Sequence, residues 1–259
     1  MDVSEVSQAQ RRERRVLWTG GWDSSFRVLQ LLFDTDHVVA PVYFVNPQRR
    51  SLLHEVRAMD TISARARRRR PDFEARLLPT QYIEMERVPV DPDVTAALQR
   101  CKARGFIGPQ YDYLARYLRW VPEAGPLELC IERDSRPHVL MKSVLVPAGE
   151  HQVYQLRADQ REQDLGVLFR DMEFPLLEYS KQAMREQAER SGYLDILDKS
   201  WFCQYPIGAS PCGRCSPCEQ VVKAGFTHRL SRRARLRYQL SLQRRLREWR
   251  REHDPASAS

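Results

Sequence analysis

The sequence lacks several features that would assign it to a common class. Among its 259 residues, no apolar run approaches the length of a membrane span. The polar N-terminus, Met-Asp-Val-Ser-Glu-Val-Ser-Gln, is not typical of a signal peptide. The six histidines show no metal-binding spacing, and no internal repeat is present. We therefore expect a cytoplasmic protein with reduced thiols and no membrane partner.

The charge is abundant but uneven. Hydrophobic residues make up 42% of the chain, which is enough for one sizeable core with or without a small appendage. Lysine plus arginine number 42 against 34 acidic residues, so the net charge is +8. Residues 65–70 read Arg-Ala-Arg-Arg-Arg-Arg, and residues 229–251 hold ten arginines and one glutamate. Such clusters suit phosphate-bearing partners or an acidic protein face, although a solvated helix face is the commoner explanation.

A glycine-containing loop near the N-terminus predicts an anion site. The run Thr-Gly-Gly-Trp-Asp-Ser-Ser at residues 19–25 follows an apolar strand, Val16–Trp18, and opens a helix predicted from Ser24. Two glycines allow close backbone approach, and the first N–H groups of a helix favour negative charge. The lysine of a Walker A loop and the third glycine of a dinucleotide fingerprint are both missing. The loop therefore predicts a pyrophosphate cradle formed by Gly20, Gly21, Ser24 and Ser25. A plain turn followed by a capped helix is the alternative interpretation.

Four of the six cysteines lie close together in the C-terminal third, with the spacing C-x8-C-x2-C-x2-C. This spacing favours a tetrahedral zinc site, and an iron–sulfur cluster is the competing interpretation. We expect a structural Zn²⁺ because four ligands from one segment leave no open position for catalysis. The predicted ligands are Cys203, Cys212, Cys215 and Cys218, whereas Cys101 and Cys130 are expected in the core.

These two motifs resemble one enzyme family. The loop resembles the Ser-Gly-Gly-x-Asp-Ser loop of the PP-loop ATP pyrophosphatases, with Thr19 in place of the usual serine. The segment from Ser200 to Phe226 resembles the zinc segment of the 7-cyano-7-deazaguanine synthases, the PP-loop enzymes of queuosine-precursor biosynthesis. Residues 174–184 resemble that family's entry to a late helix, and Gln48 and Arg49 match its Tyr-Gly-Gln-Arg-His run.

The resemblance implies ATP, Mg²⁺ and Zn²⁺ as cofactors and ATP-dependent adenylation of a carboxylate as the chemistry. Ammonia then displaces AMP to give an amide, and a second adenylation gives a nitrile. Lys181 would neutralise phosphate charge, unless it is an ordinary surface lysine. Asp23 would hold Mg²⁺ through its hydration shell or simply cap the helix. The implied catalytic residues are Asp23, Ser24 and Lys181, and the implied nucleotide-binding residues are Thr19, Gly20, Gly21, Asp23, Ser24, Ser25 and Arg49.

The middle of the chain departs from the family. Gly108-Pro109-Gln110 stands where the family has Gly-Arg-Asn, and residues 133–137 replace its substrate loop. We therefore expect a 7-deazaguanine carboxylate as substrate, with the reaction stopping at an amide. Three alternatives stay open. The acceptor could be a protein amine, because relatives occur in antiphage defence clusters. A tRNA-thiolating enzyme is less favoured because Cys101 and Cys130 are the only cysteines in the middle of the chain, and the last alternative is a binding protein without activity.

Apolar strands alternate with helical patterns, which predicts a doubly wound parallel α/β sheet. Strands are expected at 15–19, 37–45, 75–80 and 127–132, and helices at 24–34, 51–69, 93–104, 109–120 and 180–192. A nucleotide-binding domain (14–198) would precede a zinc module (199–228) and a basic helical tail (229–259). Tyr238, Leu242, Leu246 and Trp249 form an apolar stripe on that tail, which would dock on the domain or on a second subunit in a homodimer.

Overall fold

The computed structural model describes residues 13–105, 107–133, 135–148 and 153–241. A seven-stranded sheet forms its centre, with the strand order β3-β2-β1-β4-β7-β6-β5. The strands are β1 (Glu13–Leu17), β2 (Val38–Val45), β3 (Gln81–Glu84), β4 (Leu127–Glu128), β5 (Leu145–Pro147), β6 (Tyr154–Leu156) and β7 (Met172–Phe174). Neighbours from β3 to β7 in this order pair in parallel, which confirms the α/β class and the mostly parallel sheet.

The expectation of an entirely parallel sheet is wrong at one edge. Strand β6 runs antiparallel to both β7 and β5. The chain between β5 and β6 is short, whereas a parallel crossover needs about a dozen residues or more. A second prediction also fails, since the strand expected at 75–80 lies at Gln81–Glu84. Residues Phe73–Arg76 form a helical turn instead, and Pro79 has no N–H to donate to a sheet.

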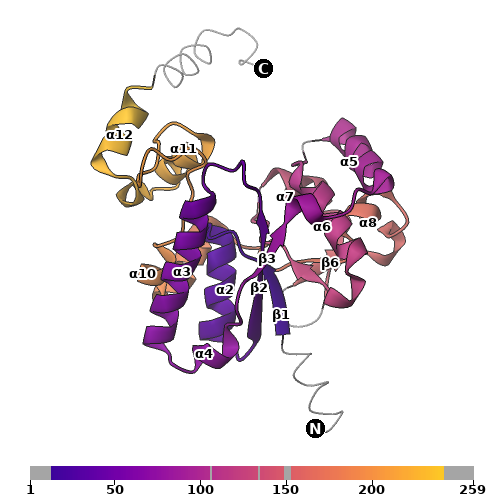
Figure 1. Ribbon diagram of the computed structural model, residues 1–259, viewed down its shortest axis with the longest axis horizontal. Coiled ribbons are helices and arrows are strands. Elements are labelled where there is room, and N and C mark those ends of the chain that lie inside the picture. Colours follow the sequence, from indigo (N-terminus) through magenta and orange to yellow (C-terminus); the bar gives the residue numbers. More distant parts are fainter. Residues whose placement is uncertain (1–12, 106, 134, 149–152, 242–259) are drawn as a thin grey trace.

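Helices cover both faces of the sheet. The α-helices are α2 (Trp22–Asp34), α3 (Leu52–Arg69), α4 (Phe73–Arg76), α5 (Pro92–Arg104), α6 (Gln110–Trp120), α7 (Arg136–Met141), α8 (Asp164–Phe169), α9 (Lys181–Arg190), α10 (Leu194–Leu197), α11 (Ser216–Lys223) and α12 (Arg232–Gln239). Short 3₁₀ turns are η1 (Met85–Arg87), η2 (Pro122–Ala124), η3 (Ala158–Gln160) and η4 (Thr227–Arg229). Figure 1 shows α2, α3, α4 and α10 on one face of the sheet and α5 to α8 on the other. None of the helices in the described ranges combines the length and apolar character that a membrane span requires.

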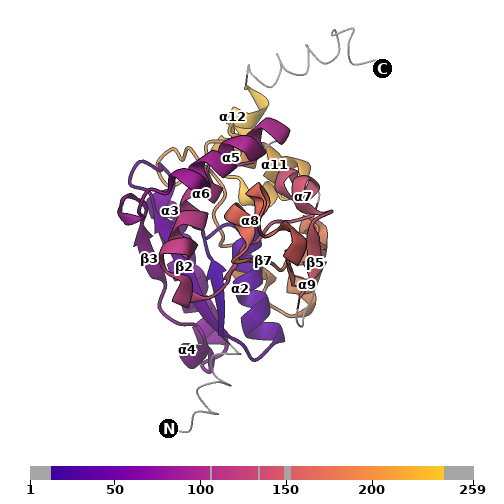
Figure 2. The same cartoon turned by 90° about the vertical axis from the view of Figure 1, so that its right-hand side faces the viewer.

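The two faces bury two separate apolar cores, because successive side chains of a strand point to opposite faces. On β1, Val16 belongs to the core under α2 and α3, and the next residue, Leu17, packs against the core under α5 and α6. Figure 2, turned by 90° from Figure 1, looks onto the side of the molecule that carries α5, α6 and α8. The sheet therefore forms a rigid platform whose strand ends can position side chains.

The strand order reverses between β1 and β4, which pair at a single register, Val16 with Glu128. The loop after β1 therefore lies at a topological switch point, where open α/β sheets commonly bind ligands. A buried ion pair lies next to this switch point. The Arg27 guanidinium donates from Nε and Nη2 to the Glu128 carboxylate, at 2.7 and 2.8 Å. This bidentate pair holds α2 to β4.

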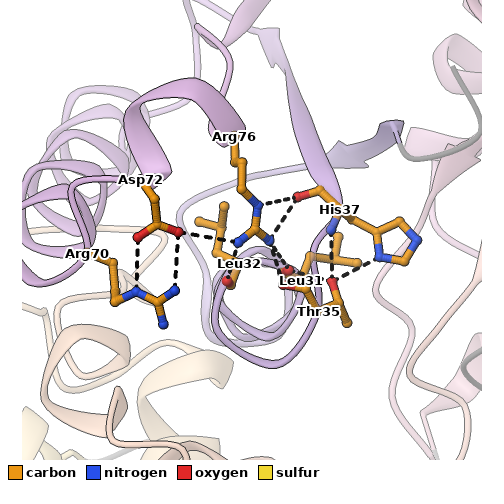
Figure 3. A network of polar contacts seen from close by, with 7 residues as sticks. All are labelled: Leu31, Leu32, Thr35, His37, Arg70, Asp72 and Arg76. Atoms are coloured by element: carbon orange, nitrogen blue, oxygen red, sulfur yellow. Dashed lines mark hydrogen bonds and ion pairs between the residues drawn. The ribbon is translucent and has the colours of Figure 1, made fainter. Parts of the chain in front are cut away.

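The far end of α2 is closed by an arginine from another element. Figure 3 shows the Arg76 side chain of α4 pointing at the carbonyl groups that end α2. Its guanidinium donates to the carbonyl oxygens of Leu31, Leu32, Thr35 and His37, at 2.6–3.1 Å. A cation at this position satisfies carbonyls that lack partners and opposes the negative end of the helix dipole. Arg76 therefore fixes the orientation of α2, which presents the loop at its other end.

The C-terminal segments pack on the end of α2 and α3 that bears the loop, as Figure 1 shows. The tail helix expected from residue 229 begins at Arg232, because η4 precedes it and the Ser231 hydroxyl caps it by accepting from Ala234 N. Ala234 is fully buried against the cysteine segment, so this part of the tail docks on its own chain. Of the predicted apolar stripe, Tyr238 is described, and Leu242, Leu246 and Trp249 lie outside the described residues.

Candidate functional site

A cleft of about 610 Å³ opens above the carboxyl end of β1. Its walls come from the loop after β1, the segment between β2 and α3, the start of α9 and the segment from Trp201 to Arg229. This volume is in the range of small-molecule sites. The segments that carry the sequence motifs, which are far apart along the chain, therefore meet at one place. The sequence-predicted residues that line the cleft are Thr19, Gly21, Asp23, Arg49 and Lys181.

The loop is held by a close backbone approach. Gly20 has φ +65°, and a Cβ atom there would lie 2.6 Å from the carbonyl oxygen of Glu55 in α3. The Gly20 carbonyl accepts from the backbone N–H of Trp201 at 2.7 Å. Only glycine meets both demands, since side chains resist a positive φ and no space remains for one. The loop is thus clamped between α3 and the start of the cysteine segment.

Helix α2 begins at Trp22 with Gly21 as its N-cap, two residues before the predicted start. The helix has no side-chain cap hydrogen bond among the residues that the structure describes. A long helix whose first N–H groups have no side-chain cap offers donors and a positive dipole end to an anion. This geometry agrees with the predicted anion site.

The two serines of the loop do not share one role. The Ser24 hydroxyl lies behind the loop, 3.2 Å from the Thr19 hydroxyl, and accepts from Thr19 N–H at 3.2 Å. The Ser25 hydroxyl is fully buried and accepts from the indole N–H of Trp18 at 3.0 Å. Gly20, Ser24 and Ser25 are not among the residues that line the cleft. They shape the loop from within.

A lysine between two carboxylates stands beside the loop. Lys181, the first residue of α9, places its Nζ 2.7 Å from Asp23 Oδ1 and 2.8 Å from Glu132 Oε2. Burial lowers the pKa of Lys181, but the attraction of Asp23 and Glu132 outweighs it, so the net pKa is raised. The ammonium group is therefore charged throughout the neutral range and held at a fixed position at the cleft.

A second charged cluster occupies the wall formed by the start of α3. The buried Glu55 carboxylate accepts from the Tyr43 hydroxyl at 2.8 Å, from the Ser51 hydroxyl at 2.6 Å and from Arg49 Nη1 at 3.0 Å. Burial and the Glu55 charge raise the pKa of Tyr43, which keeps its hydroxyl protonated as a donor. This network fixes Arg49 at the rim of the cleft.

Aromatic rings and an arginine form the wall on the side of the cysteine segment. Trp201 and Phe202 line it, and the imidazole of His54 stacks on Trp201 at 4.5 Å between centroids. The Arg229 guanidinium lies over the rings of Trp22 and Phe202, at 4.9 and 5.0 Å from their centroids. Burial lowers the pKa of Arg229 to about 10, although Asp198 and Asp23 partly offset it. Arg229 therefore remains a cation at neutral pH.

The four clustered cysteines form a separate side-chain set next to the cleft. Their Sγ atoms all lie within 4.8 Å of one another, and three of the separations are 3.4, 3.9 and 3.9 Å. Tetrahedral zinc with Zn–S bonds of about 2.3 Å requires Sγ separations of about 3.8 Å. The backbone N–H groups of Arg214 and Cys215 also donate to Cys212 Sγ, as expected beside thiolates. The set can hold a metal ion such as zinc, and all six cysteines are free thiols.

Several residues of the site are not predicted from the sequence, and Glu132 and Arg229 are the two that bring charge close to the loop. Glu132 follows shortly after β4, and its position past the end of a buried strand is the signal that points to it. Arg229 stands at the start of a run of arginines, and nothing in the sequence distinguishes its buried guanidinium from the exposed ones of Arg232 and Arg233. Both contribute charge beside the loop.

The described residues of the two segments that depart from the family, 108–110 and 133–137, are absent from the lining of the cleft. Comparison of the chain with protein-family models found no match, and comparison with curated proteins found none either.

Proposed function

We propose that the protein uses ATP to adenylate a carboxylate and then transfers the acyl group to an amine, releasing AMP and pyrophosphate. One observation carries this proposal: the uncapped N-terminus of α2 opens into the same cleft as the cations Lys181 and Arg229, at the switch point of the sheet. Backbone N–H groups and fixed cations are the groups that stabilise phosphate charge. The absence of a Walker lysine favours cleavage between the α and β phosphates.

In this mechanism a carboxylate oxygen attacks the α-phosphorus of ATP, and the bond from that phosphorus to the bridging oxygen breaks. Pyrophosphate leaves with the electron pair of that bond and is held at the loop. The amine then attacks the acyl carbon, AMP leaves, and one proton is released. Lys181, fixed by Asp23 and Glu132, faces the charge that develops on the phosphates. Catalysis rests on positioning and on this preorganised charge. Mg²⁺ would be held at Asp23 through its hydration shell.

The proposed substrate is a 7-deazaguanine carboxylate, and the proposed product is its amide. Support comes from the resemblance, because the matched segments around Thr19, Arg49 and Trp201 all line one cleft. A protein amine is the alternative acceptor. The thiolation alternative is weakened because neither Cys101 nor Cys130 lines the cleft and burial raises the pKa of both thiols, whereas sulfur transfer needs a reactive thiolate.

We further propose that the metal is zinc and that its role is structural. Cys203, Cys212, Cys215 and Cys218 would supply all four ligands, leaving no position for a water or a substrate. Trp201, which binds the Gly20 carbonyl, lies two residues before the first of them. The zinc would therefore stabilise the segment that clamps the loop.

The test incubates the protein with ATP, Mg²⁺, ammonium and 7-carboxy-7-deazaguanine. Anion-exchange separation should find AMP and pyrophosphate, and mass spectrometry should find the amide. Lys181→Gln should lower turnover about 100- to 1000-fold, since it removes a charge that stabilises the transition state. Lys102→Gln, an exposed change on the distant helix α5, is the matched control and should keep full turnover.

Four outcomes would contradict parts of the proposal. ADP as the main product would exclude adenylation. Full turnover of the Lys181 variant would remove that residue from the site. Rapid conversion to the nitrile would show that the reaction does not stop at the amide, and ATP use stimulated by another carboxylate or by tRNA would exclude the deazaguanine substrate.

A further inference from the structure

Arg229 is more deeply buried than the described arginines that follow it, of which Arg232, Arg233 and Arg235 are exposed and Arg237 is half-buried. The Arg229 side chain is only 4% exposed, yet it is one of the residues that line the cleft. It follows α11 in the short turn η4, which brings it over the first residue of α2. The guanidinium lies over two aromatic rings beside the loop. Its charge is therefore buried at the cleft and does not serve to solvate the protein surface.

The hydrogen bonds of this guanidinium are incomplete. Nη2 donates to the carbonyl and to the hydroxyl oxygen of Ser200, at 2.6 and 2.7 Å. Nε is buried and has no partner among the described residues, and its nearest carboxylate oxygen, on Asp198, lies 4.0 Å away. Asp198 is also 3.3 Å from His228 Nε2. A buried cation with unfilled donors is costly unless a ligand completes it.

A second donor beside it is unfilled as well. The indole Nε1 of Trp22 is buried and has no partner within the described ranges. Trp22 begins α2, and it lines the same cleft as Arg229. Two buried donors, Arg229 Nε and Trp22 Nε1, therefore lack acceptors among the described residues, and they lie beside the first turn of α2. An oxyanion is the ligand that satisfies both of them.

Two neighbouring cations, Lys181 and Arg49, are more fully compensated by carboxylates than Arg229 is. Lys181 contacts two carboxylates within 2.8 Å, and Arg49 pairs with Glu55 at 3.0 Å. Arg229 has the more distant Asp198, at 4.0 Å, and Asp23 also acts on its charge without an ion pair between them among the described residues. Its charge is thus the less compensated one and the more available to an incoming anion.

We propose that Arg229 and Trp22 bind a phosphate oxyanion of the nucleotide at the N-terminus of α2. The identity of that oxyanion as a nucleotide phosphate rests on the proposed function. The cysteine segment is then more than a structural addition, because it carries a cation of the phosphate site into the cleft. The site is incomplete without the chain beyond residue 228.

Isothermal titration calorimetry with inorganic pyrophosphate tests this assignment on the full-length, metal-loaded protein. Arg229→Gln should weaken pyrophosphate binding about 10- to 100-fold, as expected for loss of a charged hydrogen bond. Arg229→Lys, which keeps the charge, should recover part of that loss. Arg233→Gln, an exposed change on α12, is the matched control and should bind as the wild type.

A second variant covers the case in which Arg229→Gln does not fold. Trp22→Phe keeps an aromatic face for the guanidinium and removes only the indole N–H, so it should weaken pyrophosphate binding about threefold to tenfold. Unchanged binding in Trp22→Phe, or in a folded Arg229→Gln, would overturn the assignment.

Titration with 7-carboxy-7-deazaguanine separates the two anion sources. If Arg229→Gln weakens binding of that acid and not of pyrophosphate, the residue is a carboxylate ligand and the assignment to phosphate is wrong. If pyrophosphate binding depends on Arg229 while no acid is adenylated, the inference stands and the proposed function falls. If AMP is formed and Arg229→Gln leaves pyrophosphate binding unchanged, the proposed function stands and the inference about Arg229 is wrong.

Discussion

Replacing Gly20 by alanine tests how tightly the loop is held. Gly20 has φ +65°, and its Cα lies so close to α3 that a methyl group would meet the Glu55 carbonyl oxygen at 2.6 Å. The same methyl group would lie 3.3 Å from Met59 Cγ. The carbonyl belongs to a long helix and cannot move without displacing its neighbours. We expect Gly20→Ala to fold less stably and to distort the loop.

The magnitude has two parts. A left-handed backbone costs an alanine about 1–2 kcal/mol. Forcing a methyl group into filled space costs about a further 1–3 kcal/mol, because backbone must shift. The total loss in the free energy of unfolding should therefore be about 2–5 kcal/mol.

Gly192→Ala is the matched control. Gly192 has φ +73°, and a Cβ atom there would meet nothing within 4 Å. It carries the backbone cost without the collision, so it should lose only about 1–2 kcal/mol. Equilibrium unfolding in urea, followed by circular dichroism at a fixed zinc concentration, gives both values from the midpoints.

The difference between the two variants isolates the collision with α3. If Gly20→Ala is no less stable than Gly192→Ala, the close approach between the loop and Glu55 is not a constraint. The clamped loop would then be an incorrect description, and the preorganisation assigned to the anion site would lose its basis.

Two further predictions concern the supports of the site. Arg76→Ala should lower the free energy of unfolding by about 2–3 kcal/mol, because buried carbonyls at the end of α2 lose a charged donor. Arg87→Ala removes an exposed ion pair with Glu84 and should cost less than about 1 kcal/mol. Urea unfolding measures both, and equal losses would contradict the capping role. Cys215→Ser should reduce bound zinc from about one ion per chain to near zero by elemental analysis, while Cys130→Ala keeps it. A brown protein that absorbs visible light would instead indicate an iron–sulfur cluster.

Much of the fold around the glycine loop and the cysteines follows from the sequence. The apolar run ending at Trp18 and the paired glycines predict a strand and a turn, and the structure has both in place, with α2 directly after them. The spacing of the four cysteines predicts that their sulfurs converge, and they do so within 4.8 Å. Both patterns are local, so they need no knowledge of distant contacts.

The roles of Ser24 and Ser25, in contrast, could not be predicted from the local sequence. Each residue of a helix is rotated by about 100° from the last, so the two-residue error in the start of α2 changes which face each side chain occupies. Ser25 consequently faces Trp18 in the core. The position of a helix start is set here by contacts of Gly20 with α3 and Trp201, which are far away in sequence.

Long-range contacts also decide the two features that the sequence conceals. The partner strand of β6 depends on which edge of the sheet remains open after β7 has paired with β4. The burial of Arg229 depends on where η4 docks on Trp22. Composition and periodicity describe each segment by itself and carry no information on this docking.

The hydrogen bond from Trp201 to Gly20 has a consequence for biosynthesis. It joins positions about 180 residues apart, and at typical translation rates of about 5–20 residues per second the first is made about 9–36 seconds before the second. During that interval the glycine turn lacks the partner that fixes its carbonyl. A nascent chain would therefore carry the glycine turn in an unset state until Trp201 has emerged, so any ligand that needs the turn in place could bind only after that later segment has docked.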